Sequence, residues 1–137
     1  SSTIPTAQIQ SLVDNYRDNQ LLCINENLSM NDAHSIWFNM EILNNFIAEI
    51  KAKAQEVDPN ITDADLGIRF YYAAYPEVPE STTPSNYGRR HTLVLVPTKK
   101  HESTICDFNP YSPETALALA QNHGCLVPPD NNQIESY

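Results

Sequence analysis

Thr92-Leu-Val-Leu-Val96, followed by Pro97, is the stretch that decides the fold. Its residues are apolar on both faces of an extended chain, which is typical of a strand covered on both sides. Proline has no backbone N–H to donate to a ladder. The run therefore predicts a central strand that ends at Pro97.

A second strand is predicted over Ile68–Tyr75, which is rich in β-branched and aromatic residues. Ser35–Phe38 and Ser103–Phe108 are shorter candidates. Tyrosines fall on both faces of Ile68–Tyr75, and one layer of core cannot cover them all. We expect one row of them to line a groove or a subunit contact.

Three stretches have the apolar spacing of amphipathic helices. The first runs from about Thr6, a candidate N-cap, to Arg17. The second starts after Asn39, which can cap it, and keeps one apolar side as far as Ala54. The third covers residues 112–124, with a proline at its first helical position and a glycine at its end.

The resulting order is helix, short strand, long helix, three strands and helix. It predicts the α+β class, with an antiparallel or mixed sheet of about three to four strands and helices packed mainly on one face. A length of 137 residues is usual for one domain, so we expect a single domain over residues 1–137.

Residues 76–90 separate the two clearest predicted strands and are far more than a hairpin needs. The stretch holds three prolines and ends at the basic pair Arg89 and Arg90. Loops of this length are either mobile excursions or binding loops, and the sequence leaves both open. Residues 128–137 have little periodicity, and we expect them to be mobile.

The charge balance argues against two classes of partner. Seventeen acidic residues against eight basic ones give a formal net charge of −9. Nucleic-acid binding needs clustered lysines and arginines, and the only such clusters are the pairs Arg89-Arg90 and Lys99-Lys100. We therefore expect no nucleic-acid partner and no binding to an anionic membrane.

The cysteines and glycines point to no particular chemistry. Three cysteines without a CxxC spacing are typical of reduced thiols, so we expect a cytoplasmic location. The chain starts without Met, and a removed N-terminal targeting segment stays an alternative. The three glycines stand alone, so no phosphate-binding loop and no cofactor are expected.

Four short motifs resemble a known family. They are His34-Ser-Ile-Trp-Phe38, Gly67-Ile-Arg-Phe-Tyr71 with Tyr75-Pro76, Thr92-Leu-Val-Leu-Val-Pro-Thr98 and His123-Gly-Cys-Leu-Val-Pro-Pro129. Over about residues 30–130 the chain is similar to a family of small uncharacterised bacterial proteins. The resemblance implies a bacterial single-domain protein and brings no activity with it.

Arg69 is the most informative single residue, because both faces of its predicted strand are largely apolar. A buried guanidinium must be paired. Its partner is either an acid of this chain or the carboxylate or phosphate of a ligand, which arginine binds through two parallel hydrogen bonds. The candidate internal partners are Asp32, Glu41 and Asp107.

Histidines and cysteines offer little material for catalysis or metal binding. His123 and Cys125 form one close pair at the end of the third predicted helix, whereas a zinc site needs three or four ligands. A thiolate at Cys125 is disfavoured by the helix C-terminus. We therefore expect no metal site and name no catalytic residue.

Two functional hypotheses remain. The first is a non-enzymatic binding or assembly module, a homodimer or a partner of another protein, that makes its contact through Tyr71, Tyr75 and the loop 76–90. The second is a small enzyme or a binder of an anionic ligand with a pocket around Arg69, His34 and His91. The second requires that Arg69 lacks an internal carboxylate partner.

Overall fold

The structure is a computed structural model, and it describes residues 2–137. These residues form two compact units. The first holds residues 2–36, Ala74–His91 and Cys125–Tyr137, and the second holds Trp37–Ala73 and Thr92–Gly124. None of the helices described is long and apolar enough to cross a membrane.

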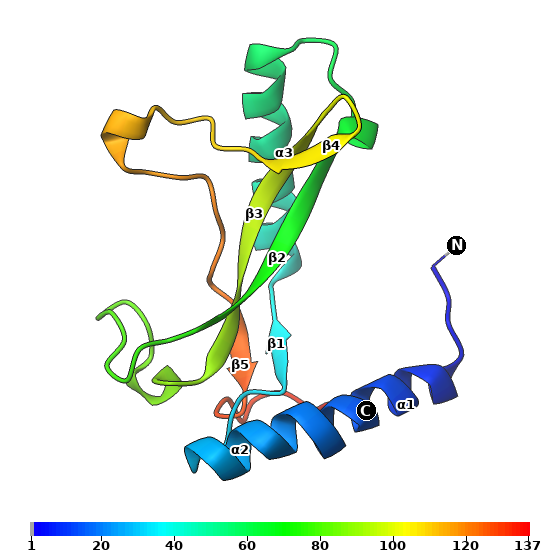
Figure 1. Cartoon of the computed structure of the whole chain (residues 1–137), viewed down its shortest axis with the longest axis vertical. Helices are drawn as coiled ribbons and strands as arrows, with labels where there is room; N and C mark the ends of the chain where they lie inside the picture. The colour runs from blue at the N-terminus through cyan, green and yellow to red at the C-terminus, as the bar shows by residue number, and fades with distance from the viewer. Residues whose placement is uncertain (1) are drawn as a thin grey trace. The chain divides into compact units, whose positions relative to one another are not determined.

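The α+β class is confirmed, because helices and antiparallel sheets both form. The larger sheet has the order β2-β3-β4, with β2 at Leu66–Ala74, β3 at His91–His101 and β4 at Thr104–Asp107. β3 is central, as the apolar run predicts. α3, at Met40–Val57, runs alongside the strands of this sheet (Figure 1).

The prediction that the central strand ends at Pro97 is wrong, since β3 continues to His101. The N–H of Phe108 donates to the carbonyl of Pro97 at 2.9 Å, so Pro97 directs its backbone toward the β4 side of the strand. Its missing N–H falls where the β3–β4 ladder ends. No hydrogen bond between β3 and β2 is lost, and the strand tolerates the proline.

The core of the second unit lies between α3 and the sheet. Phe46 and Ile50 of α3 pack with Leu95 of β3 and with Leu119. Leu95 has no exposed surface. α3 forms here because its apolar residues recur on one side and because Asn39 caps it, as predicted: the Oδ1 of Asn39 accepts from the N–H of Glu41 at 2.7 Å.

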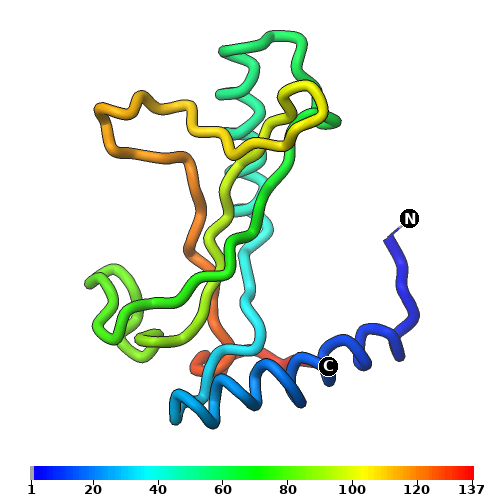
Figure 2. Tube along the Cα trace, viewed as in Figure 1, coloured from blue at the N-terminus to red at the C-terminus, as the bar shows by residue number. Residues whose placement is uncertain are grey.

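The third predicted helix does not form. Residues Pro113–Thr115 make a single 3₁₀ turn, and Ala116 adopts a left-handed backbone with φ of 54°. Figure 2 shows the following segment, in orange, returning as an extended chain. It pairs with β3, because Leu95 and Gln121 exchange two backbone hydrogen bonds of 2.8 and 3.0 Å. Tertiary pairing overrides the helix propensity of the alanine-rich run.

The first unit begins with a helix that is longer than predicted. α1, at Thr6–Asn15, passes through a π-helical turn at Tyr16–Leu21 into α2 at Leu22–Leu28. The expected end at Arg17 is therefore wrong. Thr6 is already helical and Pro5 holds the N-cap position, so the capping role predicted for Thr6 is wrong too.

A short two-stranded sheet joins β1, at Ser35–Trp37, to β5, at Cys125–Val127. Next to it lies a core cluster of Ala33, Tyr87 and Leu126. The hydroxyl of Tyr87 accepts from the N–H of Leu126 at 3.1 Å and donates to the carboxylate of Asp130 at 2.9 Å. Tyr87 thus fixes the loop 76–90 to the segment after β5.

The loop 76–90 is folded back on itself. This conformation does not decide between the two predicted roles, a mobile excursion and a binding loop. The N–H of Arg89 donates to the carbonyl of Pro76 at 3.1 Å. Gly88 lies so close to the other arm of the loop that a Cβ there would be 2.3 Å from the carbonyl oxygen of Glu77. The close approach of the two arms requires glycine at this position.

Replacing Asn39 with Ala should lower the free energy of unfolding by about 1 kcal/mol, since the first turn of α3 loses its acceptor. The measurement is urea unfolding followed by circular dichroism. Asn45→Ala, at an exposed position inside the same helix, is the control and should be neutral or slightly stabilising. Equal losses in both variants would contradict the capping role.

Burial and the neighbouring Asp130 raise the pKa of Tyr87 to about 12 from an ordinary value of 10.0. A pKa that is higher in the folded state stabilises the fold below pH 10 and loses that contribution as the pH rises toward 12. Tyr87→Phe should flatten the fall of unfolding free energy between these pH values by roughly 2 to 3 kcal/mol. Tyr72→Phe is the exposed control, and an equal flattening there would refute the assignment.

Candidate functional site

β2 is an edge strand of its sheet and is nine residues long. The Pro97–Phe108 hydrogen bond shows that odd-numbered residues of β3 direct their backbone away from β2. Gly67 faces Thr98 across the pair, because a Cβ on Gly67 would lie 2.8 Å from the Thr98 Oγ1. Odd-numbered residues of β2 therefore pair with β3, and the N–H and C=O groups of its even-numbered residues point outward.

Three consecutive aromatic side chains of β2 are exposed. Phe70, Tyr71 and Tyr72 keep 52%, 44% and 89% of their surface in solvent. Leu66 and Ile68, at the start of the same strand, pack against the core instead. The second half of β2 thus combines an unpaired backbone edge with apolar surface, the combination from which further strand pairing starts.

Arg69 has an internal carboxylate partner. Its Nη1 lies 2.5 Å from Oδ1 of Asp107, and the hydroxyl of Tyr71 donates to the other oxygen of the same carboxylate. The predicted ion pair is confirmed, with Asp107 as the acid among the three candidates. Arg69 is not buried, because its side chain is 41% exposed on the sheet face opposite α3.

The two histidines of the second hypothesis belong to separate groups in the first unit. Nδ1 of His91 lies 2.7 Å from Oδ2 of the buried Asp32, whose other oxygen accepts the N–H of His91 at 2.7 Å. Nδ1 of His34 lies 3.2 Å from Oε2 of Glu135. Arg69 belongs to the second unit and is already engaged, so the pocket predicted around these three residues loses its main support.

The remaining predicted contact residues lie in the first unit and make contacts there, although the buried Nη1 of Arg90 has no hydrogen-bond partner among the described residues. Tyr75 is half-buried and packs on Tyr87, with ring centroids 5.9 Å apart. Nη2 of Arg89 donates to the carbonyl of Leu28 at 2.8 Å. The N–H of Tyr75 donates to the carbonyl of Arg90 at 3.0 Å, which closes the base of the loop.

The prediction that His123 and Cys125 lie at a helix end is wrong. The helix is missing, and Cys125 begins β5. Burial, together with Asp130, raises the pKa of the Cys125 thiol, which keeps it protonated and poorly nucleophilic. Across residues 2–137, the histidine, cysteine and acidic side chains form no group of three that could hold a metal ion.

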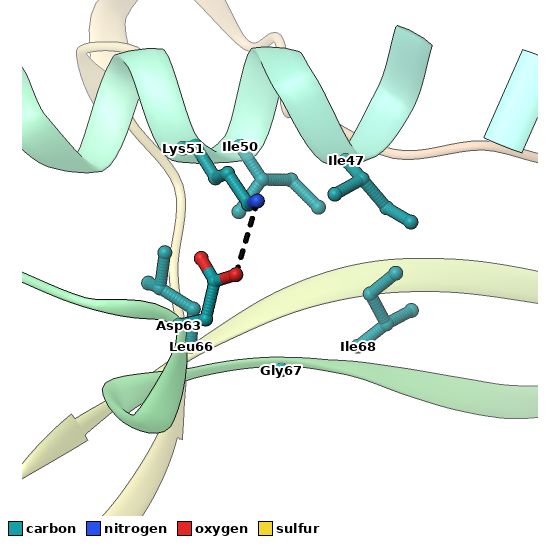
Figure 3. A pocket seen from close by; sticks show the side chains of 7 residues that line it. All are labelled: Ile47, Ile50, Lys51, Asp63, Leu66, Gly67 and Ile68. Atoms are coloured by element: carbon teal, nitrogen blue, oxygen red, sulfur yellow. Dashed lines mark ion pairs between the residues drawn. The ribbon is translucent and has the colours of Figure 1, made fainter. Parts of the chain in front are cut away.

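A shallow groove lies between α3 and the start of β2 (Figure 3). Its volume is about 210 Å³, below the usual range of roughly 300–1,000 Å³ for small-molecule sites. Lys51 and Asp63 neutralise each other across it at 3.0 Å, and the other lining side chains are apolar. Without further polar groups converging on it, the groove offers a ligand little specificity.

A cavity in the first unit contains residues that sequence reasoning missed. It brings Arg17 of the helix together with His34 and Glu135. The sequence indicates Arg17 only as a helix end, and Glu135 lies in a segment expected to be mobile. No spacing pattern links residues so far apart in the chain, so only the fold could reveal this group.

Comparison with known proteins gives no further guide: no family model, no curated protein and no solved structure matches this chain. The resemblance to small bacterial proteins therefore stays a prediction. Functional inference rests on the geometry of the site.

Removing Arg69 and Asp107 singly and together should give a coupling energy of about 0.2–1 kcal/mol, because both side chains are more than a third exposed and water screens their attraction. The variants are Arg69→Gln and Asp107→Asn, measured by chemical unfolding. Lys53 and Glu56, 3.8 Å apart on the surface of α3, form the control pair and should couple less. A coupling above that range would mean that water is excluded from the pair.

Proposed function

We propose that this chain is an assembly module that joins a second copy of itself through the outer edge of β2. The observation that supports the proposal is the exposed edge of β2 over Phe70–Tyr72, with an outward N–H and C=O at every even-numbered residue. Isolated edges of this kind are normally protected by charge, proline or a covering segment. β2 has a single charged residue, Arg69, and no proline.

The sequence of β2 is self-complementary about Phe70. In an antiparallel pair of two copies centred there, each Phe70 would face its equivalent and Ile68 would face Tyr72. Arg69 would face Tyr71 on the opposite side of the sheet. A guanidinium that hydrogen-bonds Asp107 in its own plane keeps a face for stacking on an aromatic ring, so this pairing preserves the Arg69–Asp107 contact.

The charge of β2 itself does not oppose contact between two copies of this edge. The net charge of −9 makes two copies repel each other on average. β2 has no acidic residue of its own, so its side chains add little to this repulsion where two β2 strands approach. Tyrosine and phenylalanine are also among the residues enriched at protein interfaces.

The proposed contact is smaller than the surface considered from the sequence. Tyr75 and the loop 76–90 belong to the first unit and use their aromatic rings in its core, so the proposed contact excludes them. The enzymatic alternative has less support, because Arg69 is paired internally. An extended segment of another protein could pair with the same edge, and a wild-type chain that stays monomeric in the experiment below would favour that occupant over a second copy.

The test is sedimentation equilibrium on the purified chain over a range of concentrations. The wild type should form a dimer, and Tyr72→Lys should raise the dimer dissociation constant at least tenfold, that is, by about 1.4 kcal/mol. Val78→Lys is the matched control, since Val78 is a similarly exposed apolar residue outside β2 with 84% of its surface in solvent. It should leave the dimer unchanged.

Two proline substitutions test whether the outward backbone groups of β2 make the contact. Tyr72→Pro removes an outward N–H and should abolish the dimer while the fold persists, whereas Tyr71→Pro removes an N–H paired with β3 and should destabilise the fold. A wild-type chain that stays monomeric at the highest soluble concentration overturns self-assembly. A dimer that survives Tyr72→Pro places the contact elsewhere.

A further inference from the structure

The cavity in the first unit is lined by three segments that are distant in sequence. Val13 and Arg17 come from the helix, His34 and Ser35 from the start of β1, and residues 135–137 from the segment after β5. Its volume is about 280 Å³, close to the lower limit for small-molecule sites.

The cavity contains two buried side-chain nitrogens that make no hydrogen bond of good geometry. The Nε of Arg17 and the Nδ1 of His34 are buried from solvent, and neither finds a hydrogen-bond partner among the described residues. A buried donor without a partner costs about 1–3 kcal/mol, and more where the group is charged. Such a pair is rare in a stable fold and needs a physical explanation.

Glu135 places a carboxylate near both donors but binds neither tightly. Its Oε2 lies 3.2 Å from the Nδ1 of His34 and 3.9 Å from the Nη2 of Arg17. Charge-assisted hydrogen bonds of this type are normally about 2.7–2.9 Å long. Glu135 therefore marks the position of an anion without satisfying the groups around it.

The two atoms of Arg17 involved, Nε and Nη2, form one edge of the guanidinium group. This edge donates two parallel hydrogen bonds to the two oxygens of a carboxylate. One oxygen of such a ligand would lie within reach of His34. Val13 and Tyr137 would flank its apolar part.

We propose that this cavity binds a small organic carboxylate, and that Glu135 occupies the anion position as a weak internal substitute. An incoming carboxylate displaces Glu135 and completes the hydrogen bonding of Arg17 and His34. The site is independent of the proposed dimer contact, since its residues lie in the first unit and β2 is almost wholly in the second.

The test is a titration with acetate and benzoate, followed by the ¹⁵N NMR signal of the Arg17 Nε–H and by chemical-shift mapping. Both probes should shift this signal. Glu135→Gln should tighten binding at least about fivefold, because the internal competitor is removed and more of the protein is competent to bind. Glu26→Gln, the same charge change at an exposed position of α2, should leave the affinity unchanged.

Arg17→Gln should weaken binding at least about tenfold, and Arg17→Lys should restore only part of it, since lysine keeps the charge but lacks the two-donor edge. Circular dichroism checks that both variants fold, and Arg17→Lys serves alone if Arg17→Gln unfolds. Tyr72→Lys should bind the probes like the wild type. If the chain does not dimerise, the carboxylate-site proposal is unaffected. If the probes do not bind, the dimer proposal is unaffected.

Three results would overturn the proposal. The first is an Arg17 Nε–H signal that does not move with either probe. The second is equal affinity in wild type and Glu135→Gln. The third is inorganic phosphate binding more tightly than acetate and benzoate, which would assign the cavity to phosphate-like anions instead of carboxylates.

Discussion

The burial of Leu95 between α3 and the sheet is the interaction on which the second unit depends. Complete removal of a leucine side chain from water stabilises a fold by about 1.5–3 kcal/mol, and Leu95 has no exposed surface. The backbone N–H and C=O of Leu95 are also hydrogen-bonded, because Leu95 exchanges two hydrogen bonds with Gln121. With β3 fixed in this way, β2 takes one side of it and the opposite backbone edge of β2 remains open. The proposed assembly edge is thus a direct result of how β3 is buried.

Tyr87 has the corresponding role in the first unit, although it works through a hydroxyl as well as through apolar packing. It joins the loop 76–90, the start of the segment after β5 and the ring of Tyr75. The loop 76–90, for which the sequence leaves a mobile and a binding role open, therefore contributes to a core. Tyr75 and Tyr87 pack on each other, whereas Phe70, Tyr71 and Tyr72 of β2 remain exposed to solvent.

Local signals predicted the elements that depend on local physics. The asparagine cap and the apolar stripe of α3, the β-branched run of β3 and the β-branched and aromatic residues of β2 were sufficient to predict them. The helix over residues 112–124 failed, because Gln121 pairs with β3 and propensity cannot anticipate a distant backbone partner. The same limit applies to the candidate sites. Asp107 could be named as one of three partners of Arg69, whereas the meeting of Arg17, His34 and Glu135 had no signal in the sequence.

The composition of β2 also matters before the chain has folded. Residues 66–74 include one charge and three adjacent aromatics, and the strand that pairs with them lies beyond the loop 76–90. Until β3 is available, this segment resembles the short apolar runs that start intermolecular β-aggregation. The acidic surplus elsewhere in the chain keeps unfolded copies apart by mutual repulsion. Neutralising that surplus would therefore lower the yield of soluble protein even where it leaves the folded state intact.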